Sequence, residues 1–231
     1  MSSPTWKNYQ ALMLAEPDLF TNQEAFYRII VAEDEAAACE RAAQAGLRAE
    51  GLPPDWGNIG EVFADQYIRV LRDPVQPAGH GPRTYIRILP AQRLGHGVAV
   101  LPVHLGRILV LRHYRHATRQ WHLEIPRGFG RKDMTDEQNA VRELREEIGC
   151  GSEPAMTDLG EMYPDSGLMA HKVQLFCAVV DQYTAPERSV EAISEIIAMA
   201  PREFEQHVGD GRINDSFSIC AFMRAKAKSL L

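Results

Sequence analysis

The chain has 231 residues, 45% of them hydrophobic, and a net charge of −6 at pH 7 with a pI near 5.8. This hydrophobic content is that of a globular protein, and the acidic balance argues against a protein that coats nucleic acid, because neutralising phosphates requires a basic face. The four cysteines stand far apart and no apolar run reaches the length of a membrane span, so we expect a cytoplasmic protein with reduced thiols and with neither nucleic acid nor membrane as a partner.

The first sixty residues contain a segment typical of a helix. Residues 21–47 are rich in helix formers, begin with a capping residue, Thr21 or Asn22, and end near a glycine, although the pattern also allows a break within the segment. The stretch GLPPDWGNIG that follows supplies helix breakers. Because the length is large for one small domain and short for two full ones, we expect a helical N-terminal extension over residues 1–60 and a larger domain over residues 61–231.

Apolar runs bounded by turn residues predict a series of strands in the larger domain. Strands are expected at residues 63–73, 83–89, 97–115, 121–126, 172–181 and 195–201. The run at residues 97–115 reads as a hairpin that turns at Leu105 and Gly106. Two helices are expected to close the chain, at about residues 201–208 and 215–230. Strands on both sides of one helix, with helices at the end, predict an α+β domain in which a mixed sheet is covered on two faces.

Positive charge is concentrated in the third and fourth of these strand regions. Residues 107–127 carry five arginines and three histidines beside a single acid, Glu124. The local charge therefore differs from the net charge, and the segment is typical of a site that binds a small polyanion.

The segment GFGRKDMTDEQNAVRELREEIGC, residues 128–150, predicts a loop followed by a helix rich in acids. At 100° per residue, Glu143, Glu146 and Glu147 fall within one arc of about 100°, because spacings of three and four residues return to the same face. Apolar side chains cluster nearly opposite, so we expect a buried apolar face and carboxylates that point outward. These apolar residues are Val141, Leu144 and Ile148.

Packing does not require those carboxylates, and like charges at helical spacings repel by a few tenths of a kcal/mol per pair. Two explanations are open. Either Arg142 and Arg145 neutralise the acids on a salt-bridged surface helix, or the acids bind a metal ion. Hard divalent cations such as Mg²⁺ accept oxygen ligands of this kind, together with water and substrate phosphates.

The complete spacing decides in favour of the metal site. Gly128 lies fourteen residues before Arg142, and RELREEIG then supplies Arg, Glu, Leu, any residue, Glu, Glu, any residue and Gly. This pattern of 23 positions resembles the Nudix box, the loop and helix signature of the Nudix hydrolases, and it ends in Gly149 and an apolar position held by Cys150. The resemblance covers roughly residues 61–231 and implies an α/β/α sandwich.

One position departs from the family pattern. The family has a glutamate six residues after its first glycine, where this chain has Met134. In the family that glutamate is mainly a structural partner of the motif arginine, so we expect Arg142 to pair with another acid. The candidates are Asp133, Asp136 and Glu137.

Two further segments resemble the Nudix enzymes that cleave ADP-ribose, namely RHYRHATRQWHLEIPRGFG before the helix and YPDSGLMAHKVQLFCAVV after it. The resemblance implies a hydrolase, dependent on Mg²⁺ or Mn²⁺, that splits the diphosphate linkage of a small nucleoside diphosphate substrate. ADP-ribose, giving AMP and ribose 5-phosphate, is the first expectation, and another NDP-sugar or a dinucleotide is the alternative. It also implies a homodimer paired through N-terminal strands. A ligand-sensing Nudix module with weak or no catalysis is an alternative of a different class, which only Met134 favours.

The resemblance assigns roles to individual residues. The expected metal ligands are Glu143, Glu146, Glu147 and the main-chain carbonyl near Arg127. Arg115 matches an arginine that holds the diphosphate in the family, while the simpler alternative is a strand-end arginine in water. Glu124, like Arg115, is assigned to the substrate site. It either assists at the metal or pairs with a neighbouring arginine.

The general base is expected on the loop ERSVEAISE, residues 187–195, because family members often place it between the late strands. This loop offers Glu187, Glu191 and Glu195. We favour Glu191, with Glu195 next because it lies at the edge of a predicted strand; solvated loop acids are the alternative. These two and the metal ligands Glu146 and Glu147 are the predicted catalytic residues.

Overall fold

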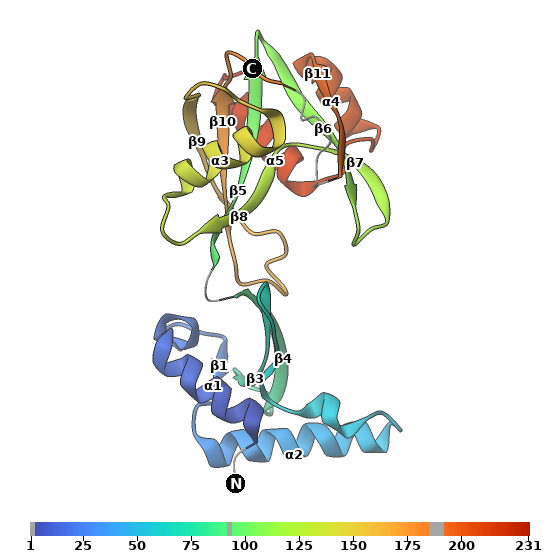
Figure 1. Cartoon of the computed structure of the whole chain (residues 1–231). Helices are drawn as coiled ribbons and strands as arrows, with labels where there is room; N and C mark the ends of the chain where they lie inside the picture. Colours follow the sequence, from blue (N-terminus) through green and yellow to red (C-terminus); the bar gives the residue numbers. More distant parts are fainter. Residues whose placement is uncertain (1–2, 92–93, 185–191) are drawn as a thin grey trace. The chain divides into compact units, whose positions relative to one another are not determined.

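The structure, a computed structural model, describes residues 3–91, 94–184 and 192–231. The described contacts divide the chain into two compact units. One is Met1–Gln92 with Asp165–Ala170, and the other is Arg93–Pro164 with His171–Leu231. Each unit has its own sheet, helices and core (Figure 1). Among the described residues, none of the helices is long and apolar enough to cross a membrane.

The N-terminal unit is built on an antiparallel sheet centred on β3 (Ile68–Pro77). This strand pairs with β1 (Tyr27–Ile29), β2 (Gly60–Ala64) and β4 (Arg83–Pro90). Its helical segments are α1 (Pro4–Ala15), η1 (Pro17–Phe20), α2 (Glu33–Ala49) and η2 (Pro54–Gly57). Buried side chains of α1, α2 and the sheet form one core, which includes Trp6, Tyr9, Cys39, Leu71 and Leu89.

The predicted N-terminal helix is present but begins later than expected, because a strand occupies the first part of the predicted segment. Asn22 does not cap a helix; its side chain accepts a hydrogen bond from Ile29 N at 2.7 Å and donates one to Ile29 O at 3.0 Å. This pair of bonds holds the chain extended as β1. The contacts also divide the chain near residue 92 rather than at the expected residue 60, since β2, β3 and β4 complete the sheet that β1 begins.

The second unit contains a mixed sheet in the order β11-β6-β5-β10-β9, with β7 beside β6 and β8 beside β5. The strands are β5 (Leu94–His104), β6 (Arg107–Arg115), β7 (Gln120–Glu124), β8 (Arg127–Arg131), β9 (Ala155–Met162), β10 (Val173–Val179) and β11 (Ile193–Met199). The helices are α3 (Asp136–Ile148), α4 (Pro201–Gly209) and α5 (Ser216–Ala227). Strands β5 and β10 are parallel and the other pairs are antiparallel, so the predicted mixed sheet is confirmed.

Successive residues of the central strands point to opposite faces, and each face is buried under helices. Leu109 and Leu111 of β6 pack in a cluster with Leu144 of α3. Val110, between them, packs in a second cluster with Phe204 of α4 and Phe222 of α5. The predicted α/β/α sandwich is therefore confirmed. Each fully buried side chain of this size stabilises the fold by roughly 1.5 to 3 kcal/mol relative to exposure.

Most of the predicted elements of this unit are present. The hairpin turns at Leu105 and Gly106, both with positive φ, and the closing helices lie where they were expected. The prediction missed β8 and β9. Strand β8 reads as a loop because its five residues contain two glycines, which are disfavoured in strands, and pairing with β5 overrides that preference.

Candidate active site

Helix α3 begins and ends at positions set by the box. The Thr135 side chain accepts from Gln138 N at 3.2 Å, and the Gln138 side chain accepts from Thr135 N at 2.9 Å, which forms a capping box. The helix ends at Gly149, whose φ of 61° and ψ of 35° are left-handed values that suit glycine. These two ends fix which way every α3 side chain points.

The expected outward direction of the three glutamates is wrong for two of them. Glu143 is 5% exposed and Glu147 is 2% exposed, whereas the side chain of Glu146 is 43% exposed. The predicted apolar face is nevertheless buried, since Val141, Leu144 and Ile148 are all in the core. Helix α3 is therefore covered on more than its apolar face.

Strand β8 is what covers the two buried glutamates. Glu147 Oε2 accepts a hydrogen bond from Arg127 N at 3.0 Å. A Cβ on Gly128 would lie 2.2 Å from Glu143 Oε1, so only a residue without a side chain allows this close approach. Gly128, which opens the box, and Arg127, which precedes it, thus lie directly on the box glutamates.

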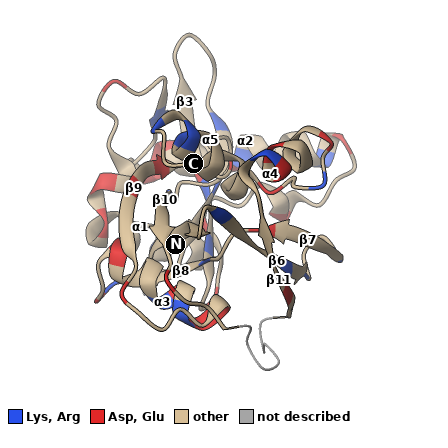
Figure 2. Ribbon diagram, turned by 90° about the horizontal axis from the view of Figure 1, so that it is seen from above, with Lys and Arg blue, Asp and Glu red and all other residues tan. Residues whose placement is uncertain are grey.

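The motif arginine Arg142 also lies against the glutamates. Its guanidinium forms ion pairs with Glu143 and Glu146 and donates to Phe129 O at 2.9 Å. Acidic and basic residues are interspersed along the helix (Figure 2). The expected pairing of Arg142 with one of three other acids is wrong, because its guanidinium contacts Glu143, Glu146 and the β8 backbone instead. In the part of the chain that the structure describes, it forms no ion pair with Asp133, Asp136 or Glu137.

By donor type, the three glutamates fit a hard divalent cation. Burying carboxylates such as Glu143 and Glu147 costs several kcal/mol each unless a cation or hydrogen bonds compensate. Within the described residues, however, no three acids, histidines or cysteines already converge as a metal cluster. Arg142 holds two of the carboxylates, so a cation would have to share or displace that arginine. The carboxylate oxygens suit a divalent cation, and the side chains of Glu143 and Glu146 would have to move relative to Arg142 to bind one.

A buried acid joins the arginines that precede the box. Glu124 is 1% exposed; its Oε1 lies 3.1 Å from His113 Nδ1 and beside Arg115 Nη2, and its Oε2 lies 3.6 Å from Arg127 Nη2. Burial alone would raise the pKa of Glu124, but His113 and the two arginines outweigh burial and lower the pKa to about 2. Glu124 is thus a carboxylate that fixes the position of both arginines, in agreement with the alternative that it pairs with neighbouring arginines.

Two cavities share Arg115 and Arg127 as a common wall. The first has a volume of about 180 Å³; its other lining residues are Gly97, Val98, Gly128, Phe129, His171, Val173 and Phe217. The second has a volume of about 340 Å³; its other lining residues are Ala117, Thr118, His122, Glu124, Asn214, Asp215 and Ser216. Together they reach the size of small-molecule sites, roughly 300 to 1,000 Å³.

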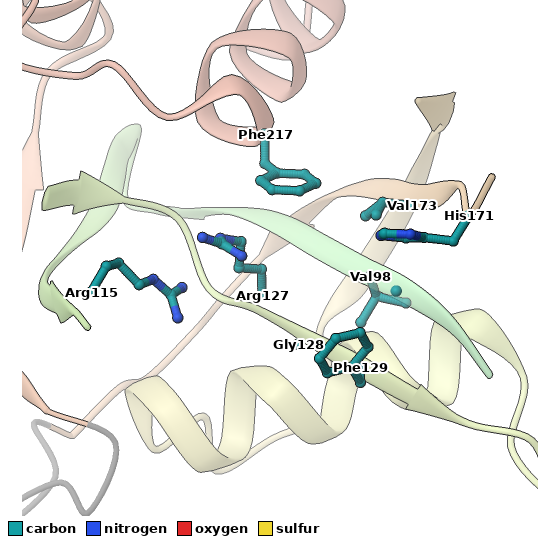
Figure 3. Close-up of a pocket in the computed structure, with 9 residues that line it drawn as sticks. Val98, Arg115, Arg127, Gly128, Phe129, His171, Val173 and Phe217 are labelled. Atoms are coloured by element: carbon teal, nitrogen blue, oxygen red, sulfur yellow. The ribbon is translucent and has the colours of Figure 1, made fainter. Parts of the chain in front are cut away.

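Arg127 connects these cavities to the box. Figure 3 shows Phe217 of α5 on one side of β8 and α3 on the other, with Arg127 between them. The backbone N–H of Arg127 bonds Glu147, its guanidinium carbon lies 4.7 Å from the centre of the Phe217 ring, and its Nε lies 3.8 Å from Asp215 Oδ1. A polyanion held by Arg115 and Arg127 would therefore lie next to the strand that covers the box glutamates.

Of the three candidates for the general base, Glu195 is the one that the described residues include. Glu187 and Glu191 lie outside the described residues. Glu195 is exposed, its backbone is paired in register with Arg112 of β6, and it lines neither cavity. Its neighbours Ile193 and Ile196 point to the α3 face.

Sequence reasoning missed the contribution of α5 to the site. Phe217 and Asp215 lie about ninety positions after Arg127, and no local pattern links two such segments. The signal that was available is Asp215, which caps α5 by accepting from Ser218 N at 2.9 Å. It locates the start of the helix but says nothing about which cavity that start faces.

Comparisons with known proteins identify the family and the fold. Residues 92–215 match the model of the NUDIX domain family. The chain is similar to a crystal structure of an ADP compounds hydrolase, with a TM-score of 0.63 and 18% sequence identity, over 74% of this chain and 90% of that one. None of the curated proteins matches the chain.

Proposed function

The chain belongs to the Nudix hydrolase family, and on that basis we propose that it hydrolyses the diphosphate linkage of a nucleoside diphosphate derivative. The observation that carries the proposal is the position of Arg115 and Arg127, which line two cavities on the side of β8 opposite to the box glutamates. A diphosphate paired with both guanidinium groups would lie against β8, the strand that contacts the glutamates.

The residues of this chain have distinct roles in the proposal. Glu143, Glu146, Glu147 and the main-chain carbonyl of Arg127 would hold Mg²⁺ or Mn²⁺. A divalent cation held there supplies the charge neutralisation that a diphosphate needs before water attacks phosphorus. Arg115 binds and orients the diphosphate, and Glu124 holds Arg115 in place. Glu191 remains the first candidate for the base that accepts the proton of water, with Glu195 second.

ADP-ribose is the substrate we propose, with AMP and ribose 5-phosphate as products. Its support is the resemblance of the segments that flank the box and the fold shared with a hydrolase of ADP compounds. Another NDP-sugar or a dinucleotide is the second candidate. A sensing module without catalysis is favoured only by Met134, and the ion pairs of Arg142 keep its guanidinium engaged with the box even without the family's glutamate.

A panel of diphosphate compounds tests the proposed function. The purified chain with saturating Mg²⁺ should convert ADP-ribose to AMP and ribose 5-phosphate faster than ADP-glucose or a dinucleoside polyphosphate, with products identified by chromatography. Faster turnover of another member would reassign the substrate. Binding of these compounds without turnover of any would favour the sensing module instead.

Removal of the divalent cation should abolish activity reversibly. We expect excess EDTA to stop turnover, and excess Mg²⁺ or Mn²⁺ to restore it, because the glutamates alone add negative charge to a negative substrate. Turnover assays before and after chelation, with circular dichroism to follow folding, provide the measurement. Activity that persists after chelation and dialysis would exclude the metal assignment.

Arg115→Lys should weaken substrate use without unfolding the chain. Lysine keeps the positive charge beside the buried Glu124 but lacks the planar fork that binds two phosphate oxygens. We expect kcat/KM to fall by about 10- to 100-fold, mainly through KM. Arg119→Lys is the matched control, since Arg119 is exposed and lies outside the lining of both cavities. Equal effects of the two substitutions would contradict the role of Arg115.

We also propose a homodimer, a division of the chain into an N-terminal unit and a Nudix catalytic domain, and a cytoplasmic location. All four cysteines are free thiols, which suits a reducing compartment. We expect light scattering at assay concentrations to give twice the 25.9 kDa mass of one chain. A fully active protein with the mass of a single chain would remove the dimer from the proposal.

A further inference from the structure

His171 lies in the wall of the first cavity, and none of the proposed catalytic or binding roles involves it. It comes two residues before Val173, the first residue of β10, which pairs with Gly97 of β5. Figure 3 shows Arg115 and His171 at opposite ends of the labelled residues, with Arg127 between them. The pairing of β10 with β5 therefore brings this histidine to the cavity that the two arginines line.

The polar side chains around this cavity are hydrogen-bond donors. Arg115, Arg127 and His171 are the lining residues whose side chains can form hydrogen bonds. A guanidinium group only donates. The other lining residues are glycines or have apolar side chains, namely Gly97, Val98, Gly128, Phe129, Val173 and Phe217. A ligand in this cavity therefore has to supply acceptors.

His171 is itself a neutral donor. Burial lowers the pKa of His171, so the ring is uncharged at pH 7 and carries its proton on one nitrogen. Neither ring nitrogen forms a hydrogen bond with the part of the chain that the structure describes, and Nδ1 is enclosed as well. A proton on Nδ1 would be a buried donor without an acceptor, which is costly, so we place the proton on Nε2.

We propose that His171 is a specificity-determining residue, which donates a hydrogen bond from Nε2 to an acceptor atom of the substrate while Arg115 and Arg127 hold the diphosphate. This inference rests on the proposed function, and it concerns substrate binding rather than bond cleavage. The acceptor is either a phosphate oxygen or a neutral oxygen or nitrogen of a group attached to the diphosphate. Binding should therefore depend on an N–H donor at position 171 and not on a positive charge there.

Binding of ADP-ribose without turnover tests this role. Calorimetric titration of the full chain in excess EDTA gives the dissociation constant in the absence of the cation that the proposed hydrolysis requires. His171→Leu removes the donor, and it should weaken binding by about 3- to 10-fold for a neutral acceptor or about 10- to 100-fold for a phosphate oxygen. His171→Gln places an amide N–H near the position of Nε2, and it should bind within about 3-fold of the wild type.

A second compound and two further variants complete the experiment. Imidodiphosphate has neither base nor sugar. If His171→Leu weakens its binding, the acceptor is a phosphate oxygen, and if only ADP-ribose binding weakens, the acceptor belongs to an attached group. His80→Leu is the matched control, because His80 is exposed and lines neither cavity, and it should bind as the wild type does. His171→Phe also lacks the donor but keeps a ring, and it replaces His171→Leu if thermal unfolding shows that leucine unfolds the chain.

The outcomes separate this role from the proposed function. If a folded His171→Leu or His171→Phe variant binds both compounds as tightly as His80→Leu, the role of His171 is wrong. A loss that His171→Gln does not restore would also overturn it. A wild type that binds ADP-ribose but does not hydrolyse it with Mg²⁺ would overturn the proposed function, while the variants would still decide the role of His171. A wild type that binds neither compound would overturn both.

Discussion

Glu147→Gln and Glu146→Gln should each lower turnover by several orders of magnitude and leave the chain folded. Each substitution removes one negative charge from the group of carboxylates that would hold the divalent cation. Folding should survive for different reasons at the two positions. After Glu147→Gln the amide oxygen of the new side chain can still accept from Arg127 N, and the side chain of Glu146 is already 43% exposed. Steady-state turnover at saturating Mg²⁺, with thermal unfolding in parallel, provides the measurement.

Glu137→Gln is the matched control for these variants. Glu137 is an exposed acid in the first turn of the same helix, so the substitution removes the same charge from α3 at a distance from β8. We expect it to keep near wild-type turnover. If Glu137→Gln were as inactive as the other two, net helix charge would account for the effect, and the assignment of specific ligands would be wrong.

Gly128→Ala should abolish most of the activity with little loss of stability. The added Cβ would meet Glu143 Oε1 at 2.2 Å, and the atom in its way is the end of a flexible side chain, which can move aside. The carboxylate would then leave its position under β8. A shift of about 1 Å in a catalytic group can cost about 10²-fold in rate. We therefore expect a loss of that order in turnover and an unchanged unfolding midpoint.

Two other glycines provide contrasting controls. A Cβ on Gly151 would meet nothing within 4 Å, so Gly151→Ala should be neutral in both activity and stability. A Cβ on Gly130 would lie 2.1 Å from His96 O, a backbone atom that cannot turn aside, so Gly130→Ala should destabilise the fold. A fully active Gly128→Ala variant would show that Glu143 does not need its observed position.

The pattern of the box was enough to predict α3 and its end at Gly149, because periodicity is a local property of the chain, and the resemblance to the family implied the sandwich around it. It was not enough to predict the burial of Glu143 and Glu147. A helical pattern indicates which residues share a face, but here β8 covers the face that the apolar residues leave free. The same limit explains why the partners of Arg142 were predicted wrongly, since they depend on where β8 lies.

The cavities could not be predicted from sequence for a related reason. They form where β6, β8 and the start of α5 meet, and the pairing of segments so far apart is set by the whole sheet rather than by any motif. The N-terminal strand β1 was missed because Asn22 looks like a helix cap, although its amide bonds the backbone of Ile29. Tertiary partners override local preference at both places.

The site of bond cleavage tests the central claim most directly. The chain is incubated with ADP-ribose and saturating Mg²⁺ in water labelled with a heavy oxygen isotope, and the products are examined by phosphorus NMR and mass spectrometry. We expect AMP and ribose 5-phosphate in equal amounts, with one labelled oxygen on the phosphate of one of them, because water attacks phosphorus within the diphosphate. ADP with free ribose as products, or label on a sugar carbon, would contradict it.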